Sequence, residues 1–385
     1  MFKYFKYPIN HPSKYASLQK EADAGRWIWN YFLTRNINQY KIDKTFVWYN
    51  QMSKELTQLK QTHLGSQLRY PWLVEVSSTS LQQKLKDLDL ALHQAKRGFP
   101  RFKSKKYKSD SFKHNQAFGI KTNQIKIPKI GKIRIKQHRP LEGKVKSITI
   151  KQDNDKWHCS ILCQLPDIST KELTTSVGID LGLKTFAVLS NGQSYHMPKY
   201  YRSKQEQLAK RQRALARKQI SSKRRDKAKS SIRRLHRHIS NQRVNQLHHW
   251  SKAITKQYDI ICVEDLNIKD MLSNHSLAKA ISDQGWRIFI NQLEYKSLWA
   301  GGKTIKIDRF YPSSQTCSSC GSLKKLTLSD REYVCISCGC VIDRDLNASI
   351  NIEQRGLSTG SYKSVSPDIM MGVGLSSTVL LGPCS

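Results

Sequence analysis

Three neighbouring stretches decide how this chain folds: Cys317-Ser-Ser-Cys320, Cys335-Ile-Ser-Cys338 and Asp343-Arg344-Asp345-Leu346-Asn347-Ala348. Two Cys-x-x-Cys pairs with fourteen residues between them can wrap four thiolates around one tetrahedral Zn²⁺. A redox dithiol would need only one such pair, so two pairs at this spacing favour the metal. We therefore predict a structural zinc site made of Cys317, Cys320, Cys335 and Cys338, directly before a candidate catalytic carboxylate, Asp345.

The composition indicates a globular, multidomain protein that binds a polyanion. The chain has 385 residues and a formal net charge of +37, from 66 Lys and Arg against 29 Asp and Glu. Charge of one sign at this density repels itself unless a polyanion neutralises it, and nucleic acid is the obvious partner. A membrane surface is the rival, but no run of about 18 apolar residues occurs.

The start of the chain and its cysteines suggest an intracellular protein. Residues 1–7 carry positive charge without the apolar core of a signal peptide. We expect Cys159, Cys163 and Cys262 to be buried thiols, and Cys340 to be a spare thiol or substitute metal ligand. This usage suits metal binding in a reducing compartment. We therefore expect a cytoplasmic protein of a prokaryotic cell.

The first half of the chain changes from a helical to a strand period. Apolar residues recur every three or four positions from about residue 12 to 35, and again at Leu81, Leu85, Leu88 and Leu92, which predicts helices within 11–97. Residues 117–165 instead alternate apolar and polar side chains, which predicts strands. We expect residues 2–7 to pair with them in a small antiparallel β-barrel that the helical segment interrupts.

Two basic segments are predicted to contact nucleic acid. Arg101, Lys103 and Lys105 alternate with Phe102, so cations could pair with phosphates while the ring stacks on a base. Residues 202–243 hold sixteen Lys and Arg and only two acids, which predicts two basic helices, joined near residues 221–222, along a phosphate backbone. The alternative for both segments is a solvated basic surface that binds no ligand. The candidate contacts in the second segment are Arg211, Arg213, Arg224, Arg225, Arg233 and Arg234.

The second half of the chain reads as a sheet with helices. Residues 176–182 begin a buried strand that carries Asp180, and Asn191-Gly192 between apolar runs predicts a hairpin. Residues 258–265 read as a central strand that ends in carboxylates. A helix over 282–300, a strand over 304–307 and a last helix over 345–354 are expected to follow.

Three carboxylates, Asp180, Glu264 and Asp345, stand at the edges of these elements. RNase H-like folds use such an arrangement to hold two Mg²⁺ ions, which activate a water and stabilise the leaving oxygen of a phosphodiester. Clustered carboxylates repel unless cations neutralise them, and Mg²⁺ or Mn²⁺ prefers oxygen ligands. Each acid could instead cap a helix or pair with a cation. Asp265 and Asp343 are rival candidates; Glu264 and Asp265 face opposite ways on a strand, so only one can point into the site.

The motifs together resemble the TnpB proteins of insertion sequences, relatives of the type V CRISPR effector nucleases. The matching stretches are 178–182, 263–266, Gly285-Trp286 with 293–296, 311–315 and 343–348, with 98–102 upstream. The resemblance implies a wedge β-barrel (1–10 and 98–171) that holds a helical recognition insert (11–97). It also implies a RuvC-like nuclease domain (172–311 and 343–355) with a zinc-ribbon insertion (312–342). The Ser- and Gly-rich residues 356–385 are expected to form a disordered tail.

The resemblance also implies a function. TnpB proteins bind a guide RNA from the end of their element, recognise a short adjacent motif in double-stranded DNA, and cut both strands with one Mg²⁺-dependent site. By carry-over, Asp180, Glu264 and Asp345 would be the metal-binding triad, and Tyr49 and Gln82 would contact the adjacent motif. Because all three acids are present, we expect an RNA-guided DNA endonuclease. A nuclease-inactive RNA-guided regulator and a strand-transferring transposase are the alternatives.

Overall fold

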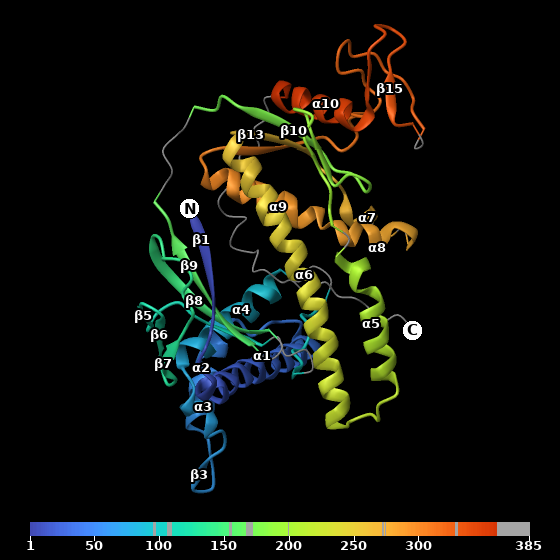
Figure 1. Cartoon of the computed structure of the whole chain (residues 1–385). Helices are drawn as coiled ribbons and strands as arrows, with labels where there is room; N and C mark the ends of the chain where they lie inside the picture. Colours follow the sequence, from blue (N-terminus) through green and yellow to red (C-terminus); the bar gives the residue numbers. More distant parts are fainter. Residues whose placement is uncertain are drawn as a thin grey trace. The chain divides into compact units, whose positions relative to one another are not determined.

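The computed structural model describes residues 1–94, 98–105, 110–153, 156–166, 172–198, 200–271, 273, 275–327 and 330–359. The chain divides after Asp167 into two compact units, each of which contains helices and strands (Figure 1). The expected tail beyond residue 359 lies outside the described residues. No helix in the described ranges is both long enough and apolar enough to cross a membrane.

The strands of the first unit form two antiparallel sheets. The larger has the order β1-β9-β8-β4, with β1 (Phe2–Pro8), β9 (Lys156–Gln164), β8 (Lys144–Asp153) and β4 (Ser111–His114). The smaller has the order β5-β6-β7, with β5 (Gly119–Lys121), β6 (Gln124–Ile127) and β7 (Gly131–Arg134). An isolated bridge between Ile9 and Ile135 connects them. Residues 2–7 pair as expected, but the strands form two bridged sheets rather than one continuous barrel.

These two sheets share one hydrophobic core. Alternate side chains of a strand point to the same face, and the inward ones here are almost all apolar. Tyr7, Ile125, Ile133 and Ile161 are fully buried in this cluster, and so are the expected thiols of Cys159 and Cys163.

Helices occupy the chain between β1 and β4. They are the short 3-10 helix η1 (Pro12–Lys14), α1 (Tyr15–Asp43), α2 (Tyr49–Gln61), α3 (Trp72–Glu75) and α4 (Ser78–His93), with a small hairpin of β2 (His63–Leu64) and β3 (Gln67–Leu68). The helix expected to end near residue 35 thus runs to Asp43. The four leucines of α4 pack against Ile28 and Phe32 of α1, as the leucine spacing predicted.

The second unit is built on a mixed five-stranded sheet. Its order is β12-β11-β10-β13-β14, with β12 (Ser194–Tyr195), β11 (Ala187–Leu189), β10 (Ser176–Asp180), β13 (Ile260–Glu264) and β14 (Lys303–Ile307). Strands β10, β13 and β14 are parallel, while β11 and β12 are antiparallel. The predicted hairpin at Asn191-Gly192 joins β11 to β12, and Gly192 has the positive φ (+85°) that such a turn requires.

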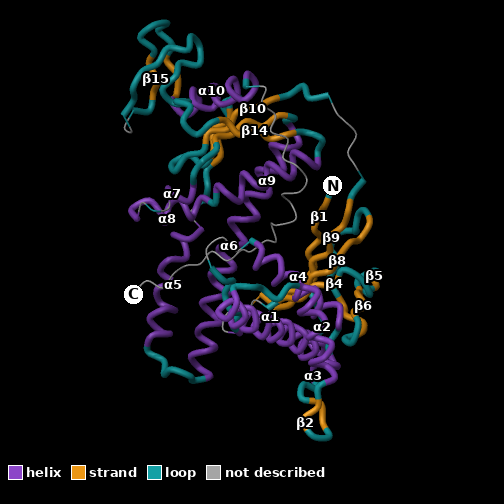
Figure 2. The backbone as a smooth tube through the Cα atoms, turned by 180° about the vertical axis from the view of Figure 1, so that it is seen from behind, coloured by secondary structure: helices purple, strands orange, loops and turns teal. Residues whose placement is uncertain are grey.

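Helices cover both faces of this sheet (Figure 2). On one face, α6 (Lys223–Gln257) and α9 (Trp286–Trp299) bury Leu247 and Phe289 against Val177 and Ile261. On the other face, α10 (Arg344–Ser358) buries Ile352 against β13 and β14. Helix α10 continues beyond its expected end at residue 354 to Ser358, so the first three residues of the expected tail (356–385) are helical instead.

Four further features complete the unit. Helix α5 (Tyr200–Ala216) precedes α6, so two basic helices flank residues 221–222 as predicted. The helix expected over 282–300 is instead two helices, α8 (His275–Gln284) and α9, because Gly285 takes a left-handed conformation (φ +74°). The short α7 (Ile268–Met271) follows β13. Before α10 lies a two-stranded ribbon of β15 (Glu332–Val334) and β16 (Val341–Asp343).

Candidate active site

Two of the predicted acids lie side by side at the ends of neighbouring parallel strands. The register of β10 and β13 ends with Ile179 beside Val263. Asp180 and Glu264 come next at the same level. Residues at the same level of adjacent strands point to the same face, so both carboxylates project toward the side of the sheet that α10 covers.

The rival acid Asp265 is turned elsewhere. Its carboxylate accepts a hydrogen bond from the guanidinium of Arg309, 2.6 Å away, and both side chains are partly exposed to solvent. Strand alternation allowed only one of Glu264 and Asp265 to point toward Asp180. In the structure, that residue is Glu264.

Helix α10 brings the third acid to the same place because it packs unusually close to the sheet. A β-carbon on Gly178 of β10 would collide with the carbonyl oxygen of Ser349, and one on Gly356 of α10 would collide with the sulfur of Cys262. The helix can therefore rest on the sheet only where both residues are glycine. Asp345 lies one turn before Ser349, on the same face of the helix.

Asp343 has a structural role at the start of this helix. It is the N-cap residue of α10, and its Oδ1 accepts hydrogen bonds from the backbone N–H groups of Asp345 and Leu346, both at 2.9 Å. Such a cap satisfies amides that the helix leaves without partners. The rival candidate Asp343 therefore fixes the first turn of α10, and with it Asp345.

The three carboxylates interact electrostatically. Burial, followed by the charges of Glu264 and Asp345, raises the pKa of Asp180 to about 8, and the charge of Arg344 only partly opposes the shift. Burial also raises the pKa of Glu264, although a hydrogen bond from the Ser313 hydroxyl to its Oε1, 2.5 Å long, works the other way. A bound divalent cation would remove this cost of gathering negative charge.

The donor set fits a hard cation. Carboxylate oxygens from Asp180, Glu264 and Asp345 are the ligands that Mg²⁺ and Mn²⁺ prefer. In the described ranges, the four paired cysteines are the one group of metal-ligating side chains drawn together within 4.8 Å.

The cysteines fit zinc. The Sγ atoms of Cys317 and Cys338 are 3.7 Å apart, and those of Cys320 and Cys335 are 3.6 Å apart. Tetrahedral Zn–S bonds of about 2.3 Å place sulfurs roughly 3.8 Å apart, so the four thiols already have the spacing of a zinc site. Cys340 stays outside the cluster, where its sulfur accepts a hydrogen bond from Ser319.

Two buried amides join the cysteine segment to α10. Asn347 donates to the carbonyl of Thr316 (2.7 Å) and accepts from the backbone N–H of Ser318 (2.9 Å). Asn351, one turn later, donates to the carbonyls of Ser313 and Thr316. The sequence reasoning missed the roles of Ser313 and Asn351. The available signal was two asparagines four residues apart on one face of the predicted helix, where their side chains can reach the same neighbouring segment.

The basic helices use their arginines in two ways. Arg211 donates to the carbonyl of Ser231, and Arg225 donates to the carbonyls of Leu215 and Lys218, so these two guanidiniums hold α5 against α6. Arg213, Arg224 and Arg234 are exposed, and Arg233 is half-buried. The exposed set fits the predicted phosphate contacts, whereas Arg211 and Arg225 are already engaged.

In the first unit, Lys103 is turned inward. Its ammonium lies 3.7 Å from the centre of the Trp29 ring, and burial lowers its pKa to about 7. The Lys103 ammonium is thus already in contact with an aromatic ring, and its predicted phosphate contact stays a prediction. Arg101 and Lys105 are exposed, and Lys105 lies 3.2 Å from Asp23. Residues 106–109 of this basic segment lie outside the described residues.

Tyr49 and Gln82 lie on neighbouring helices. Tyr49 begins α2, where its backbone N–H donates to Asp89 of α4 at 2.8 Å. The ammonium of Lys86 sits 5.1 Å from the Tyr49 ring centre. Gln82 is exposed one turn before Lys86 on α4, so Gln82 and Tyr49 can reach one ligand.

Known proteins share these features. Residues 160–275 match the OrfB_IS605 family, described as "Probable transposase", and residues 286–352 match the "Cas12f1-like, TNB domain". A "Putative RNA-guided DNA endonuclease" of Streptomyces pristinaespiralis is 34% identical over 94% of this chain and 90% of its own length. A protein of the same description from Escherichia coli, InsQ, is 32% identical over 88% of each chain.

The likeness extends to more distant proteins. A TnpB-like protein of Acanthamoeba polyphaga mimivirus is 27% identical over 58% of this chain and 46% of its own length. The fold resembles that of Cas12f1 in a Cas12f1-sgRNA-target DNA complex, with a TM-score of 0.50, 15% identity, and coverage of 91% of this chain and 98% of that one. The extent of the likeness to the bacterial relatives decides the assignment: this chain belongs to the TnpB family.

Proposed function

We propose that this protein is an RNA-guided DNA endonuclease that hydrolyses phosphodiester bonds at Asp180, Glu264 and Asp345. The observation that carries the proposal is the meeting of these three carboxylates where β10, β13 and α10 come together. A buried cluster of negative charge raises the pKa of Asp180 to about 8, which is costly unless the site serves a cation. The bacterial relatives named as RNA-guided DNA endonucleases support the same function.

The carboxylates would hold two Mg²⁺ or Mn²⁺ ions, which supply an activated water and stabilise the leaving oxygen when bound. Asp180 and Glu264 would set the position of these ions from rigid parallel strands. Asp345 would complete the site from the capped first turn of α10. The Ser313 hydroxyl would orient Glu264, because a ligand held by a second hydrogen bond keeps its geometry.

The fold supports this assignment. The strand order β12-β11-β10-β13-β14, with the first three strands as an antiparallel meander, is that of RNase H-like nucleases such as RuvC. We propose that residues 172–311 and 343–355 form this domain, and that 312–342 are a zinc-ribbon insertion. In the first unit, 1–10 with 98–171 and 11–97 would be the wedge and recognition parts.

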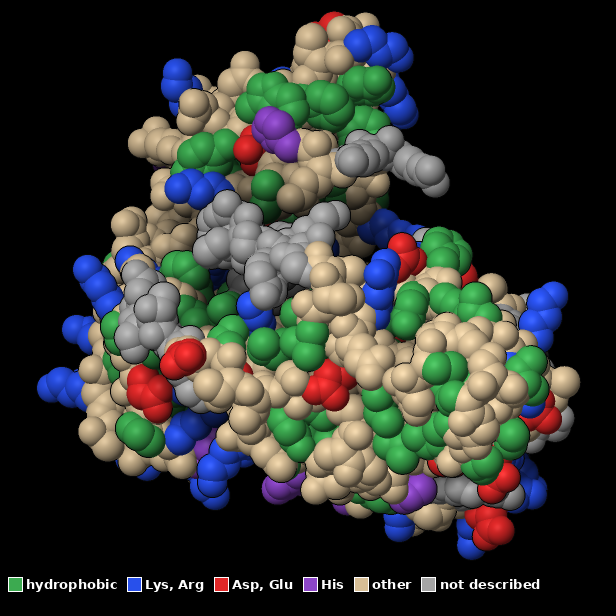
Figure 3. Space-filling view, turned by 90° about the horizontal axis from the view of Figure 1, so that it is seen from above, with side chains coloured by type: hydrophobic (Ala, Val, Ile, Leu, Met, Phe, Trp, Pro, Cys, Tyr) green, Lys and Arg blue, Asp and Glu red, His purple; other side chains and the backbone are tan. Residues whose placement is uncertain are grey.

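The partners follow from charge and family. A guide RNA from the element's end and a double-stranded target with an adjacent motif would neutralise the net charge of +37. Base pairing would read the target sequence, so the protein would mainly hold nucleic-acid backbones. Lys and Arg spread over the visible surface agree with such diffuse contacts (Figure 3).

One reaction distinguishes the endonuclease from the two alternatives, a nuclease-inactive regulator and a strand-transferring transposase. The protein, loaded with its element-end RNA, is given matched duplex and Mg²⁺ beside an Asp180→Ala variant. We expect cleavage by the wild type, and binding without cleavage by the variant. Wild-type binding without cleavage would identify a regulator instead, and joined DNA ends formed without RNA would identify a strand-transferring transposase.

A further inference from the structure

The turn between β14 and the cysteine segment presents an exposed aromatic ring. Phe310 is 86% exposed, which makes it the most exposed aromatic side chain among the residues that the structure describes. Its neighbour Tyr311 packs instead into the cluster that Ile352 of α10 forms with the sheet, and the Arg355 guanidinium lies 5.5 Å from the Tyr311 ring centre. The chain thus buries one ring of this pair and turns the other toward solvent.

Both ends of this turn are tied to the candidate catalytic carboxylate Glu264. Before the turn, Ile307 of β14 is paired with Glu264 of β13. After the turn, the Ser313 hydroxyl donates a hydrogen bond to the Glu264 carboxylate at 2.5 Å. Phe310 is three positions after Ile307 and three before Ser313, and three extended residues span at most about 11 Å. Phe310 is therefore held beside the carboxylate site.

Hydrogen bonds fix the shape of the turn. The Asp308 carboxylate accepts from the backbone N–H of Phe310 at 2.7 Å, and the Asp308 carbonyl accepts from the N–H of Tyr311 at 3.2 Å. Arg309 is engaged as well, because its guanidinium donates to Asp265. A ring presented by a turn that is already ordered loses little conformational freedom when it binds a ligand.

The place of Phe310, rather than its exposure alone, points to a ligand. A single exposed apolar side chain is common on protein surfaces and needs no explanation. Phe310 differs because it stands beside three acids that the proposed function assigns to the cleavage of DNA. Its ring has no hydrogen-bonding group, so a ligand must offer it a flat apolar face. Every nucleobase has such a face, and stacking on an aromatic side chain tolerates any sequence.

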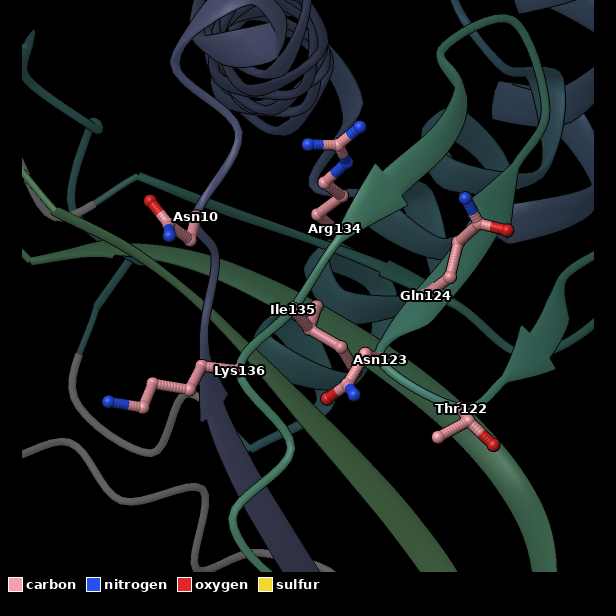
Figure 4. Close-up of a pocket in the computed structure, with 7 residues that line it drawn as sticks. All are labelled: Asn10, Thr122, Asn123, Gln124, Arg134, Ile135 and Lys136. Carbon is pink, nitrogen blue, oxygen red and sulfur yellow. The ribbon is translucent and has the colours of Figure 1, made fainter.

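A pocket would be the other place for a base. The pocket beside β6 and β7 has a volume of about 520 Å³, and Asn123, Gln124 and Arg134 are among its lining residues (Figure 4). None of its lining side chains is aromatic, so this pocket offers no surface on which a base could stack. It also belongs to the first unit, whereas the carboxylates belong to the second.

We propose that Phe310 stacks on a base of the DNA strand that enters the proposed active site, and so holds the reacting phosphate at the three carboxylates. This inference rests on the proposed function. The acids and their ions can contact a strand only through its phosphates, which are alike at every position. A stacked base would fix which phosphate stays at the site. Because any base can stack, Phe310 would favour one cut position without selecting a sequence, which base pairing with the RNA already reads.

The test is a double-mutant cycle between Phe310 and the DNA. RNA-loaded wild type and Phe310→Ala protein cut matched targets in which one base near the cleaved bond is removed, at successive positions of the strand that does not pair with the RNA. We expect one abasic position to slow single-turnover cleavage by the wild type about 10- to 100-fold. Phe310→Ala should cut intact DNA slowly by a similar factor and lose nothing more at that position, because the contact is already gone.

Two variants control for folding and for a general loss of apolar surface. Phe310→Trp keeps a stacking ring, so it should cut at the wild-type rate and keep the sensitivity to the abasic position. Leu298→Ala removes another exposed apolar side chain, from α9 of the same unit, and should cut every substrate as the wild type does. Phe310→Ala should melt at the wild-type temperature, because the side chain it removes is exposed.

Photocrosslinking makes the test independent of cleavage. Iodouracil replaces the bases near the cleaved bond, Ca²⁺ replaces Mg²⁺, and crosslinked peptides are identified by mass spectrometry. We expect a crosslink at Phe310 in the wild type. A wild type that crosslinks at Phe310 but does not cut with Mg²⁺ would contradict the proposed function and leave the base contact standing. Additive effects at every abasic position, or crosslinks only at other residues, would overturn the inference.

Discussion

The close contact between α10 and the sheet makes Gly178→Ala the most informative substitution. A β-carbon at this position would lie 2.7 Å from the backbone nitrogen of Glu353, and closer still to the carbonyl oxygen of Ser349. Both are backbone atoms of α10, so no side-chain rotation can relieve the clash. Ordinary contact begins near 3.4 Å, so the helix must retreat by at least about 0.7 Å.

Two effects should follow from that retreat. Overpacking should destabilise the second unit by about 1–3 kcal/mol. Asp345 moves with α10, and misplacing a catalytic group by about 1 Å can reduce a rate by roughly 100-fold. We therefore expect RNA-loaded Gly178→Ala protein to bind target DNA normally and to cut it about 100-fold more slowly in single-turnover assays.

The matched control is Gly119→Ala in the first unit. Its added β-carbon would meet only Lys126 at 3.5 Å, an ordinary contact, so its cleavage rate should stay near the wild-type value. Wild-type cleavage by Gly178→Ala would refute the idea that the close approach of α10 positions Asp345. A variant that fails to melt cooperatively would be replaced by Gly356→Ala, which tests the same contact from the helix side.

Three other perturbations test the surroundings of the site. Ser313→Ala removes the hydrogen bond that lowers the pKa of Glu264, so the pKa of Glu264 should rise. The Mg²⁺ concentration for half-maximal cleavage should increase about 10- to 100-fold. Ser314→Ala is the neighbouring control. The folded-state pKa of Asp180 is raised to about 8, so protonated Asp180 stabilises the fold at low pH and this contribution is lost as the pH rises toward 8. Asp180→Asn should therefore have a higher melting temperature than the wild type at pH 8 in Mg²⁺-free buffer. An unchanged melting temperature would count against the buried cluster of carboxylates. Cys335→Ser should lose the bound zinc and most cleavage, because Asn347 and Asn351 tie the cysteine segment to α10, whereas Cys340→Ser should keep one zinc per chain by elemental analysis.

Local patterns were sufficient for much of the second unit. Alternation and apolar runs located β10 and β13, and Asn191-Gly192 located the hairpin, because a strand and a tight turn depend on a few adjacent residues. The zinc cysteines were found for the same reason, since their spacing is local. Asp180 and Glu264 were both expected at the edges of these strands, and the parallel register of β10 and β13 brings them side by side.

Features that depend on tertiary contacts were not accessible in this way. Ser313 reaches Glu264 across 49 positions of the chain, and no local pattern links them. Lys103 looked like a free cation until the fold placed it on Trp29. The break at Gly285 was hidden because its neighbours continue the helical pattern. The strand signals likewise could not distinguish one closed barrel from two bridged sheets, since both use the same alternation.

The central claim is that Asp180, Glu264 and Asp345 together hold the catalytic ions, and Mn²⁺ binding tests it most directly. Zinc-loaded, RNA-bound protein is titrated with Mn²⁺ and followed by electron paramagnetic resonance. We predict that the wild type binds two Mn²⁺ ions, and that Asp180→Ala loses this binding while it retains RNA and zinc. Equal Mn²⁺ binding by wild type and variant would contradict the account.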